Sequence, residues 1–180
     1  MIELFNEDIF DKINIADAIC IPTNCSIVQY GINDPMNPMG ALAGAAARRW
    51  DNIPYIYAEL LRIVGAVPCV LGYIFKEERE GSYEFFTTSE YYDINKELRP
   101  NFTALIAFPT MYEIGAPASI SLVERSAKLL VELADSLSLN NIYMGAPGCG
   151  VGGLSYNDEV KPLLNKIFDD KFYVMQRDMI

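Results

Sequence analysis

Apolar runs and amphipathic stretches follow one another along most of the chain, and each pattern predicts its own kind of element. Near-continuous apolar runs predict strands that are buried on both faces of a sheet. Two further runs flank the turn-like sequence EREG and therefore predict a β-hairpin. The predicted strands cover residues 2–5, 17–23, 69–77, 82–88, 103–110, 141–147 and 171–175.

Apolar residues at helical spacing predict the helices. Pro54 suits the first turn of the second helix, and either Ser119 or Ser121 can cap the third. Pro162 lies inside the fourth helical pattern, so this helix is expected to start late or to be kinked. The predicted helices cover residues 41–50, 53–65, 121–137 and 156–168.

Strands and helices alternate in the second half of the chain, which favours βαβ units and a mostly parallel sheet between helices. The sequence predicts one domain, residues 1–180, with an α/β fold. We expect a three-layer α/β/α sandwich around a mixed, mostly parallel sheet of about six strands. Residues 24–40, rich in Asn, Pro and Gly, and residues 89–101 are expected to be loops.

Composition and charge argue against two classes of function, nucleic-acid binding and membrane binding. The chain is 51% hydrophobic and carries 14 basic against 24 acidic side chains, a net charge of −10. Because nucleic-acid affinity rests largely on Lys and Arg, direct binding to a nucleic-acid backbone is not expected. Apolar stretches are too short for a membrane span, and the acidic N-terminus lacks the features of a signal peptide. We therefore expect a cytoplasmic protein that does not bind membranes.

The chain contains no histidine, which excludes Ser-His-Asp triads, Cys-His dyads and His-ligated metals within it. Its four cysteines show neither a CxxC pair nor zinc spacing, and we interpret them as buried or inert thiols. Neither a metal site nor a cofactor is predicted. Any chemistry must come from Asp, Glu, Lys, Tyr, Cys, backbone groups or the ligand.

Three Gly- or Pro-marked segments directly follow predicted strands: PTN at residues 22–24, FPT at 108–110 and APGCGVGG at 146–153. Ligands of open α/β sheets bind beyond the carboxyl ends of strands, where such loops gather. Glycines there let backbone amides approach a phosphate, although a tight turn alone also needs glycine. The third segment matches neither the dinucleotide-binding GxGxxG pattern nor the P-loop.

Taken together, DAICIPTN, MNPMGALAGAAARRW, ALIAFPT and GAPGCGVGGLSYNDEVKPLL resemble the macrodomain family of ADP-ribose binders. The likeness is greatest to a phage and bacterial branch with PTN, MGxGLA, FPTK and GCGxGGLxW motifs. It covers most of the chain, and residues 77–101 would be an additional hairpin and loop.

The resemblance implies residues for the adenine and the distal ribose. Asp8 and Ile9 match a turn whose Asp binds the adenine amino group, with Glu7 in place of the family's glycine. A solvated turn carboxylate is the alternative role for Asp8. Thr23 and Asn24 lie where the family places an Asn near the distal ribose, and an Asx turn is the alternative for Asn24.

The resemblance also implies two loops around the diphosphate. Met39, Gly40 and Ala41 match the first loop, for which a plain helix start at Gly40 is the alternative. Leu42 stands where the pattern has a second glycine. Val151, at the centre of the second loop, would cover the sugar. The second loop comprises Gly148, Cys149, Gly150, Val151, Gly152, Gly153 and Leu154.

Several macrodomains release ADP-ribose from proteins or nucleic acids, or phosphate from ADP-ribose 1″-phosphate, but this chain departs from their catalytic residues. Ile21 replaces an Asn of one branch, and Met111 and Gly152 replace the Lys and Asp of another. A thioether forms no Schiff base and glycine is no general base. Substrate-assisted hydrolysis remains open, as do Asp34 and Glu113 as loop carboxylates.

We therefore predict a protein that binds ADP-ribose, an ADP-ribosylated target or ADP-ribose 1″-phosphate in a cleft at the carboxyl ends of the strands. A hydrolase acting on these compounds is the first alternative. An interaction module with a vestigial pocket is the second. Its contact surface would be formed by the aromatic residues of the 77–101 segment, namely Tyr83, Phe85, Phe86, Tyr91 and Tyr92.

Overall fold

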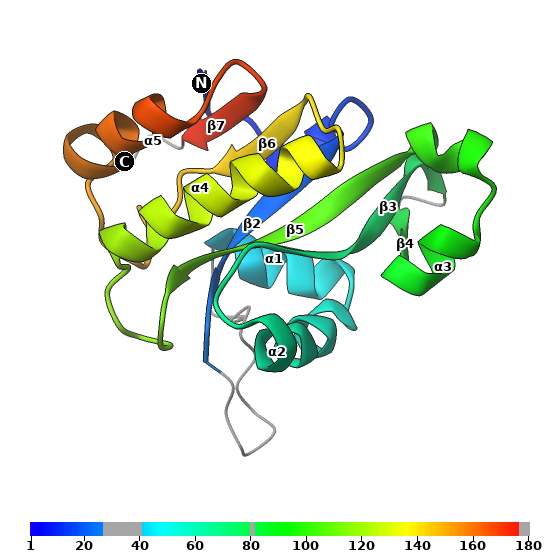
Figure 1. The fold of residues 1–180 in the computed structure, drawn as a ribbon, viewed down its shortest axis with the longest axis horizontal. Coiled ribbons are helices and arrows are strands. Elements are labelled where there is room, and N and C mark those ends of the chain that lie inside the picture. The colour runs from blue at the N-terminus through cyan, green and yellow to red at the C-terminus, as the bar shows by residue number, and fades with distance from the viewer. Residues whose placement is uncertain (27–40, 80–81, 177–180) are drawn as a thin grey trace.

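The apolar runs of the sequence form the strands of one mixed sheet (Figure 1). In the computed structural model, residues 1–26, 41–79 and 82–176 are described. The strands lie in the order β1-β7-β6-β2-β5-β3-β4. They are β1 (Ile2–Phe5), β2 (Ala18–Asn24), β3 (Cys69–Arg79), β4 (Ser82–Phe86), β5 (Phe102–Met111), β6 (Ile142–Gly145) and β7 (Phe172–Gln176).

Strands β1, β7, β6, β2 and β5 run parallel, whereas β3 pairs antiparallel with β5 and β4 antiparallel with β3. The mixed, mostly parallel character of the sheet is thus confirmed, as is the predicted hairpin. The sheet has seven strands rather than about six, because every predicted strand, including both strands of the hairpin, joins it.

Helices cover both faces of the sheet (Figure 1). The 3₁₀ turn η1 (Ile9–Lys12) and helices α1 (Ala41–Arg49) and α2 (Ile53–Val64) pack on one face. Helices α4 (Ile120–Ser136) and α5 (Lys161–Ile167) pack on the other. No helix in the described part of the chain is both long and apolar enough to span a bilayer.

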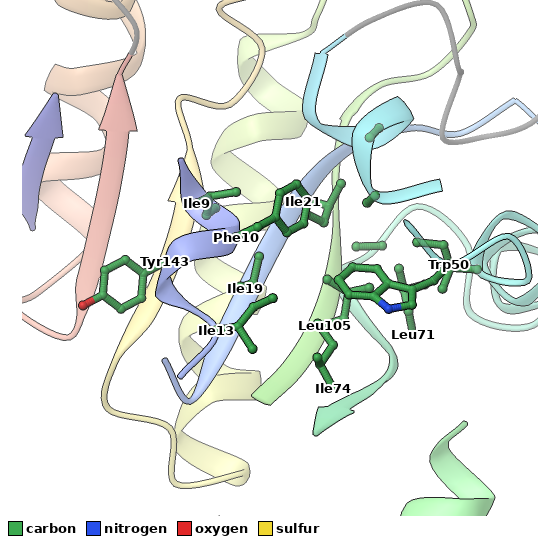
Figure 2. Close-up of a cluster of buried hydrophobic side chains, with 14 of the residues drawn as sticks. Ile9, Phe10, Ile13, Ile19, Ile21, Trp50, Leu71, Ile74, Leu105 and Tyr143 are labelled. Carbon is green, nitrogen blue, oxygen red and sulfur yellow. The ribbon is translucent and has the colours of Figure 1, made fainter. Parts of the chain in front are cut away.

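Alternation along the central strands divides the buried side chains between two cores. In β2, Ile19 and Ile21 join the core beneath α1 and α2, whereas Ala18 and Cys20 join the core beneath α4. Successive strand residues point to opposite faces, so one continuous apolar run supplies both cores. Figure 2 shows the first core, to which η1, β2, β3, β5 and β6 contribute side chains together with Trp50, the residue after α1.

The prediction of a loop at residues 89–101 is wrong. This segment lies in α3 (Thr88–Asp93) and the 3₁₀ helix η2 (Lys96–Asn101). Thr87 and Glu90 form a capping box, and the Asn95 side chain accepts a hydrogen bond from the Glu97 amide. These caps satisfy backbone amides at the starts of two short helices. The sequence did not predict these helices, because the segment is polar and has no helical periodicity.

Pro162 has the effect expected from the sequence. The segment begins as a π-helical turn, η3 (Tyr156–Val160), and the α-helix α5 starts only at Lys161. Pro162 then occupies its first turn, where a missing amide hydrogen has no consequence. The Ser155 hydroxyl accepts a hydrogen bond from the Asp158 amide and so caps the whole element.

Candidate functional site

The three segments singled out in the sequence come together at one edge of the sheet. Strands β6, β2 and β5 are neighbours and run parallel, so their carboxyl ends lie side by side. Asn24 ends β2, Met111 ends β5 and Gly145 ends β6. The loop after β5 (residues 112–119) and the loop after β6 (residues 146–155) leave from this edge.

Buried hydrogen bonds hold the ends of β2 and β5 in place. The Thr23 hydroxyl donates to the Tyr57 hydroxyl across 2.8 Å, and the Thr110 hydroxyl donates to the Thr23 carbonyl across 3.1 Å. The Asn24 side chain, 4% exposed, accepts a hydrogen bond from the Ser26 amide at 2.9 Å. Asn24 therefore forms the Asx turn that was the alternative role predicted for it.

Close contact with Ala118 holds the glycine-rich loop. The Ala118 amide donates to the Gly152 carbonyl across 2.9 Å. A Cβ on Gly148 would lie 2.9 Å from the Ala118 Cβ, and a Cβ on Gly152 only 2.5 Å from it. Gly148 also has a φ of 76°, which disfavours any other residue. Both glycines are therefore required by packing.

Hydrogen bonds within the loop close its two ends. The Leu154 amide donates to the Gly148 carbonyl, and the Gly153 amide to the Gly150 carbonyl. In the described part of the chain, by contrast, no hydrogen-bond acceptor meets the amides of Gly150, Val151 and Gly152. Three successive amides without a protein partner can bind an anion through the backbone alone.

The start of α1 lies beside this loop. A Cβ on Gly145 would lie 3.3 Å from Leu42 Cδ2, so the second residue of α1 packs against the end of β6. A helix N-terminus carries partial positive charge and unpaired amides. Ala41 is the first residue of α1, whereas Met39 and Gly40 lie outside the described residues.

Asp8 and Ile9 belong to the turn that follows β1. The Asp8 carboxylate accepts a hydrogen bond from the Phe10 amide at 3.0 Å and caps η1. Ile9 and Phe10 are buried, and the Phe10 side chain lies next to Ile21 of β2 (Figure 2). Asp8 is thus fixed in position by a local hydrogen bond.

The positions at which the resemblance implies the family's catalytic residues offer no reactive group. Ile21 is fully buried in the core beneath α1, and Gly152 has no room for a side chain. Burial raises the pKa of the Cys149 thiol to about 11, and its sulfur donates to the Pro147 carbonyl. Cys149 is therefore a neutral thiol near pH 7 rather than a nucleophile.

The other candidate acids have no organised setting in the described residues. Glu113 is exposed at the tip of the loop after β5, and Asp34 lies outside the described residues. Within the described ranges, no three Cys, Asp or Glu side chains are grouped as metal ligands. The five aromatic residues proposed as a contact surface are mostly packed against the two cores, leaving only Tyr92 exposed, at 53%.

Some residues that build this edge were not predicted. Ala118 and Tyr57 position the glycine loop and Thr23, but an alanine in a loop and a tyrosine in an amphipathic helix carry no distinctive signal. The Ser26 hydroxyl, which accepts a hydrogen bond from the Ile114 amide at 2.7 Å, is likewise unremarkable in sequence. These contacts depend on tertiary structure.

The chain is similar to known proteins in its fold rather than in its sequence. No family model matches the sequence, and no curated protein sequence is significantly similar to it. The macrodomain of Mycobacterium tuberculosis DarG matches with a TM-score of 0.65 and 14% identity over 97% of each chain. The macrodomain of Thermus aquaticus DarG matches with a TM-score of 0.61 and 16% identity over 98% of each chain.

A third match is Thermosipho africanus DarTG in complex with ADP-ribose, with a TM-score of 0.62 and 16% identity. It covers 89% of this chain and 38% of that longer one. At 14–16% identity, the three matches concern the fold. This chain has the macrodomain fold.

Proposed function

We propose that the protein binds ADP-ribose or an ADP-ribosyl group at the carboxyl edge of β6, β2 and β5. The fold supports this proposal, since one structure with the same fold is a complex with ADP-ribose. Open α/β sheets also bind their ligands at this edge. ADP-ribose 1″-phosphate and an ADP-ribosylated target are ligands of the same chemistry.

The observation that carries the proposal is the row of amides at Gly150, Val151 and Gly152, which have no acceptor among the described residues. A diphosphate presents several oxygens that can accept from such amides. Neutral backbone donors hold an anion without Lys or Arg, which suits a chain with a net charge of −10. The adjacent N-terminus of α1 adds partial positive charge.

The remaining parts of the ligand are assigned by the family resemblance. In this proposal, Asp8 and Ile9 bind the adenine, and Thr23 and Asn24 lie near the distal ribose. Met39, Gly40 and Ala41 form the first phosphate loop. The second comprises Gly148, Cys149, Gly150, Val151, Gly152, Gly153 and Leu154.

We propose binding without turnover, because the groups that perform the family's hydrolysis are replaced. Ile21 points into the core, Gly152 has no space for a carboxylate, and Met111 cannot transfer a proton. A neutral Cys149 provides no nucleophile. Hydrolysis would have to rely on the ligand's own phosphate.

Isothermal titration with ADP-ribose tests the proposal. We expect one site with a Kd of about 1–100 μM, which corresponds to about −8 to −5.5 kcal/mol. Asp8→Asn keeps a capping side chain but loses the carboxylate, so it should weaken ADP-ribose binding without unfolding η1. Asp11→Asn, on the exposed side of the same turn, is the matched control and should bind normally.

The absence of heat at 1 mM ADP-ribose would overturn the proposal and favour a vestigial pocket. Turnover is tested separately by incubating the protein with ADP-ribosylated peptide, ADP-ribosylated DNA and ADP-ribose 1″-phosphate. Release of ADP-ribose or phosphate from any of them would show that the protein is a hydrolase.

A further inference from the structure

Exposed apolar side chains gather beside the glycine-rich loop. Of the twelve large hydrophobic side chains exposed in the described part of the chain, four come from the loop after β5, the first residue of α4 and the glycine loop. Scattered apolar residues are ordinary on a surface, but a local group marks a contact site. This apolar rim consists of Tyr112 (53% exposed), Ile114 (36%), Ile120 (37%) and Val151 (68%).

The rim is built on a fixed framework. Ala118 lies between Ile114 and Ile120, and its amide donates to the Gly152 carbonyl, next to Val151. The Ile114 amide donates to the Ser26 hydroxyl across 2.7 Å, which ties the loop tip to the end of β2. The two loops therefore present their apolar side chains from a common, hydrogen-bonded base.

The rim has almost no charge. Residues 111–121 carry one charged side chain, Glu113, and residues 146–157 carry none. The next cation along α4, Arg125, lies five residues after Ile120, about 7.5 Å further along the helix axis. A nucleic-acid strand crossing the rim would meet apolar groups and a carboxylate where its phosphates need Lys or Arg.

We propose that this rim binds the polypeptide that carries the ADP-ribosyl group, through an apolar residue next to the modified side chain. This inference rests on the proposed function and on the role that the family resemblance implies for Val151, which is to cover the distal ribose. The group attached to that ribose leaves the site beside Val151 and reaches Tyr112 and Ile114. An apolar, weakly acidic rim fits a neutral or basic peptide with apolar side chains, not a nucleic acid.

Three ADP-ribosylated probes and free ADP-ribose test this proposal by titration calorimetry. The first is a nonapeptide with ADP-ribosylated serine between leucine and phenylalanine, and the second has glycines in place of these two residues. The third is a nine-nucleotide single-stranded DNA with the group on its central base. We expect the apolar peptide to bind about tenfold more tightly than free ADP-ribose, or about 1.4 kcal/mol.

Substitutions test whether the rim residues cause the tighter binding of the apolar peptide. The double variant Tyr112→Ser, Ile114→Ser should bind the apolar peptide no better than free ADP-ribose, while its affinity for ADP-ribose itself stays unchanged. Tyr92→Ser is the matched control, since Tyr92 is also 53% exposed but lies on α3 beyond the other end of the sheet (Figure 1). It should leave all affinities unchanged.

The outcomes separate the two proposals. If free ADP-ribose fails to bind, both the proposed function and the rim are overturned. If ADP-ribose binds but both peptides match it, or the double variant keeps the gain, only the rim is overturned. Tighter binding of the oligonucleotide than of the apolar peptide, lost in Arg125→Gln, would overturn the rim in favour of a nucleic-acid carrier.

Discussion

Ala118 and Gly152 are in direct contact, and the alanine leaves no space for a side chain on the glycine. The Ala118 amide donates to the Gly152 carbonyl, and a Cβ on Gly152 would lie 2.5 Å from the Ala118 Cβ and 2.6 Å from the Gly148 carbonyl oxygen. Because one of these neighbours is backbone, a rotamer change cannot relieve the overlap. The loop after β5 thus determines which residue the glycine loop can hold at this position.

Gly152→Ala is expected to destabilise the protein by about 1–3 kcal/mol through overpacking. It should also weaken ADP-ribose binding, because the loop amides must shift. Gly150→Ala is the stability control, since a Cβ there meets nothing within 4 Å. Urea unfolding of both variants measures the difference, and equal midpoints would show that the loop is not clamped by Ala118.

The hydrogen bond between Thr23 and Tyr57 is expected to support the carboxyl end of β2. Tyr57→Phe removes the buried acceptor of the Thr23 hydroxyl and should lower the free energy of unfolding by about 1–2 kcal/mol. Tyr55→Phe, on the exposed side of the same helix at 76% exposure, should change it by less than about 0.5 kcal/mol. Similar effects of both substitutions would mean that this hydrogen bond contributes nothing.

Much of the fold follows from periodicity, and the errors have a common cause. Continuous apolar runs such as residues 103–110 and the helical leucines of α4 carry a strong local signal, and both elements form as predicted. α3 and η2 are short and are held by side-chain caps and by packing. In α3, the Tyr91 ring stacks on Tyr73 of β3, with centroids 3.5 Å apart. A contact between two separate segments produces no periodic pattern of apolar residues in the sequence.

The candidate site, too, could be predicted from the sequence only in part. Strand order brings the ends of β6, β2 and β5 together, so the gathering of their loops could be predicted from the Gly and Pro residues after each strand. The contacts that shape those loops could not. Ala118 against Gly152 and Ser26 against Ile114 join loops that are far apart in sequence, and each involves a small residue or a backbone amide.

The Cys149 thiol is expected to react slowly in the folded protein. Burial, with a smaller contribution from the Glu159 charge, raises its pKa from 9.0 to about 11. At pH 8 the thiolate fraction is then about a hundredfold lower in the folded than in the unfolded chain, and alkylation, which requires the thiolate, should be much slower in the folded chain. Mass-spectrometric mapping of iodoacetamide labelling, with and without urea, measures this ratio.

The same shift predicts lower stability at alkaline pH. Between pH 9 and about 11 the unfolded chain loses the Cys149 proton while the folded chain keeps it, so the free energy of unfolding falls as pH rises. Cys149→Ala should reduce the slope of this decline, although other buried thiols contribute to it. Rapid labelling of folded protein at pH 8 would instead indicate an activated thiol and reopen a nucleophilic role.

Introducing at position 21 the asparagine that the resemblance implies for one macrodomain branch is expected to damage the fold rather than create an enzyme. Ile21 has no exposed surface and lies beside Phe10 in the core beneath α1 (Figure 2), so an amide there would be buried without partners. Ile21→Asn should lower the free energy of unfolding by about 3–5 kcal/mol, against about 0.5–1.5 kcal/mol for the control Ile21→Val. Urea denaturation provides this comparison. A stable asparagine variant that released ADP-ribose from a modified peptide would mean that position 21 reaches the ligand. A single substitution would then separate binding of ADP-ribose from its hydrolytic release.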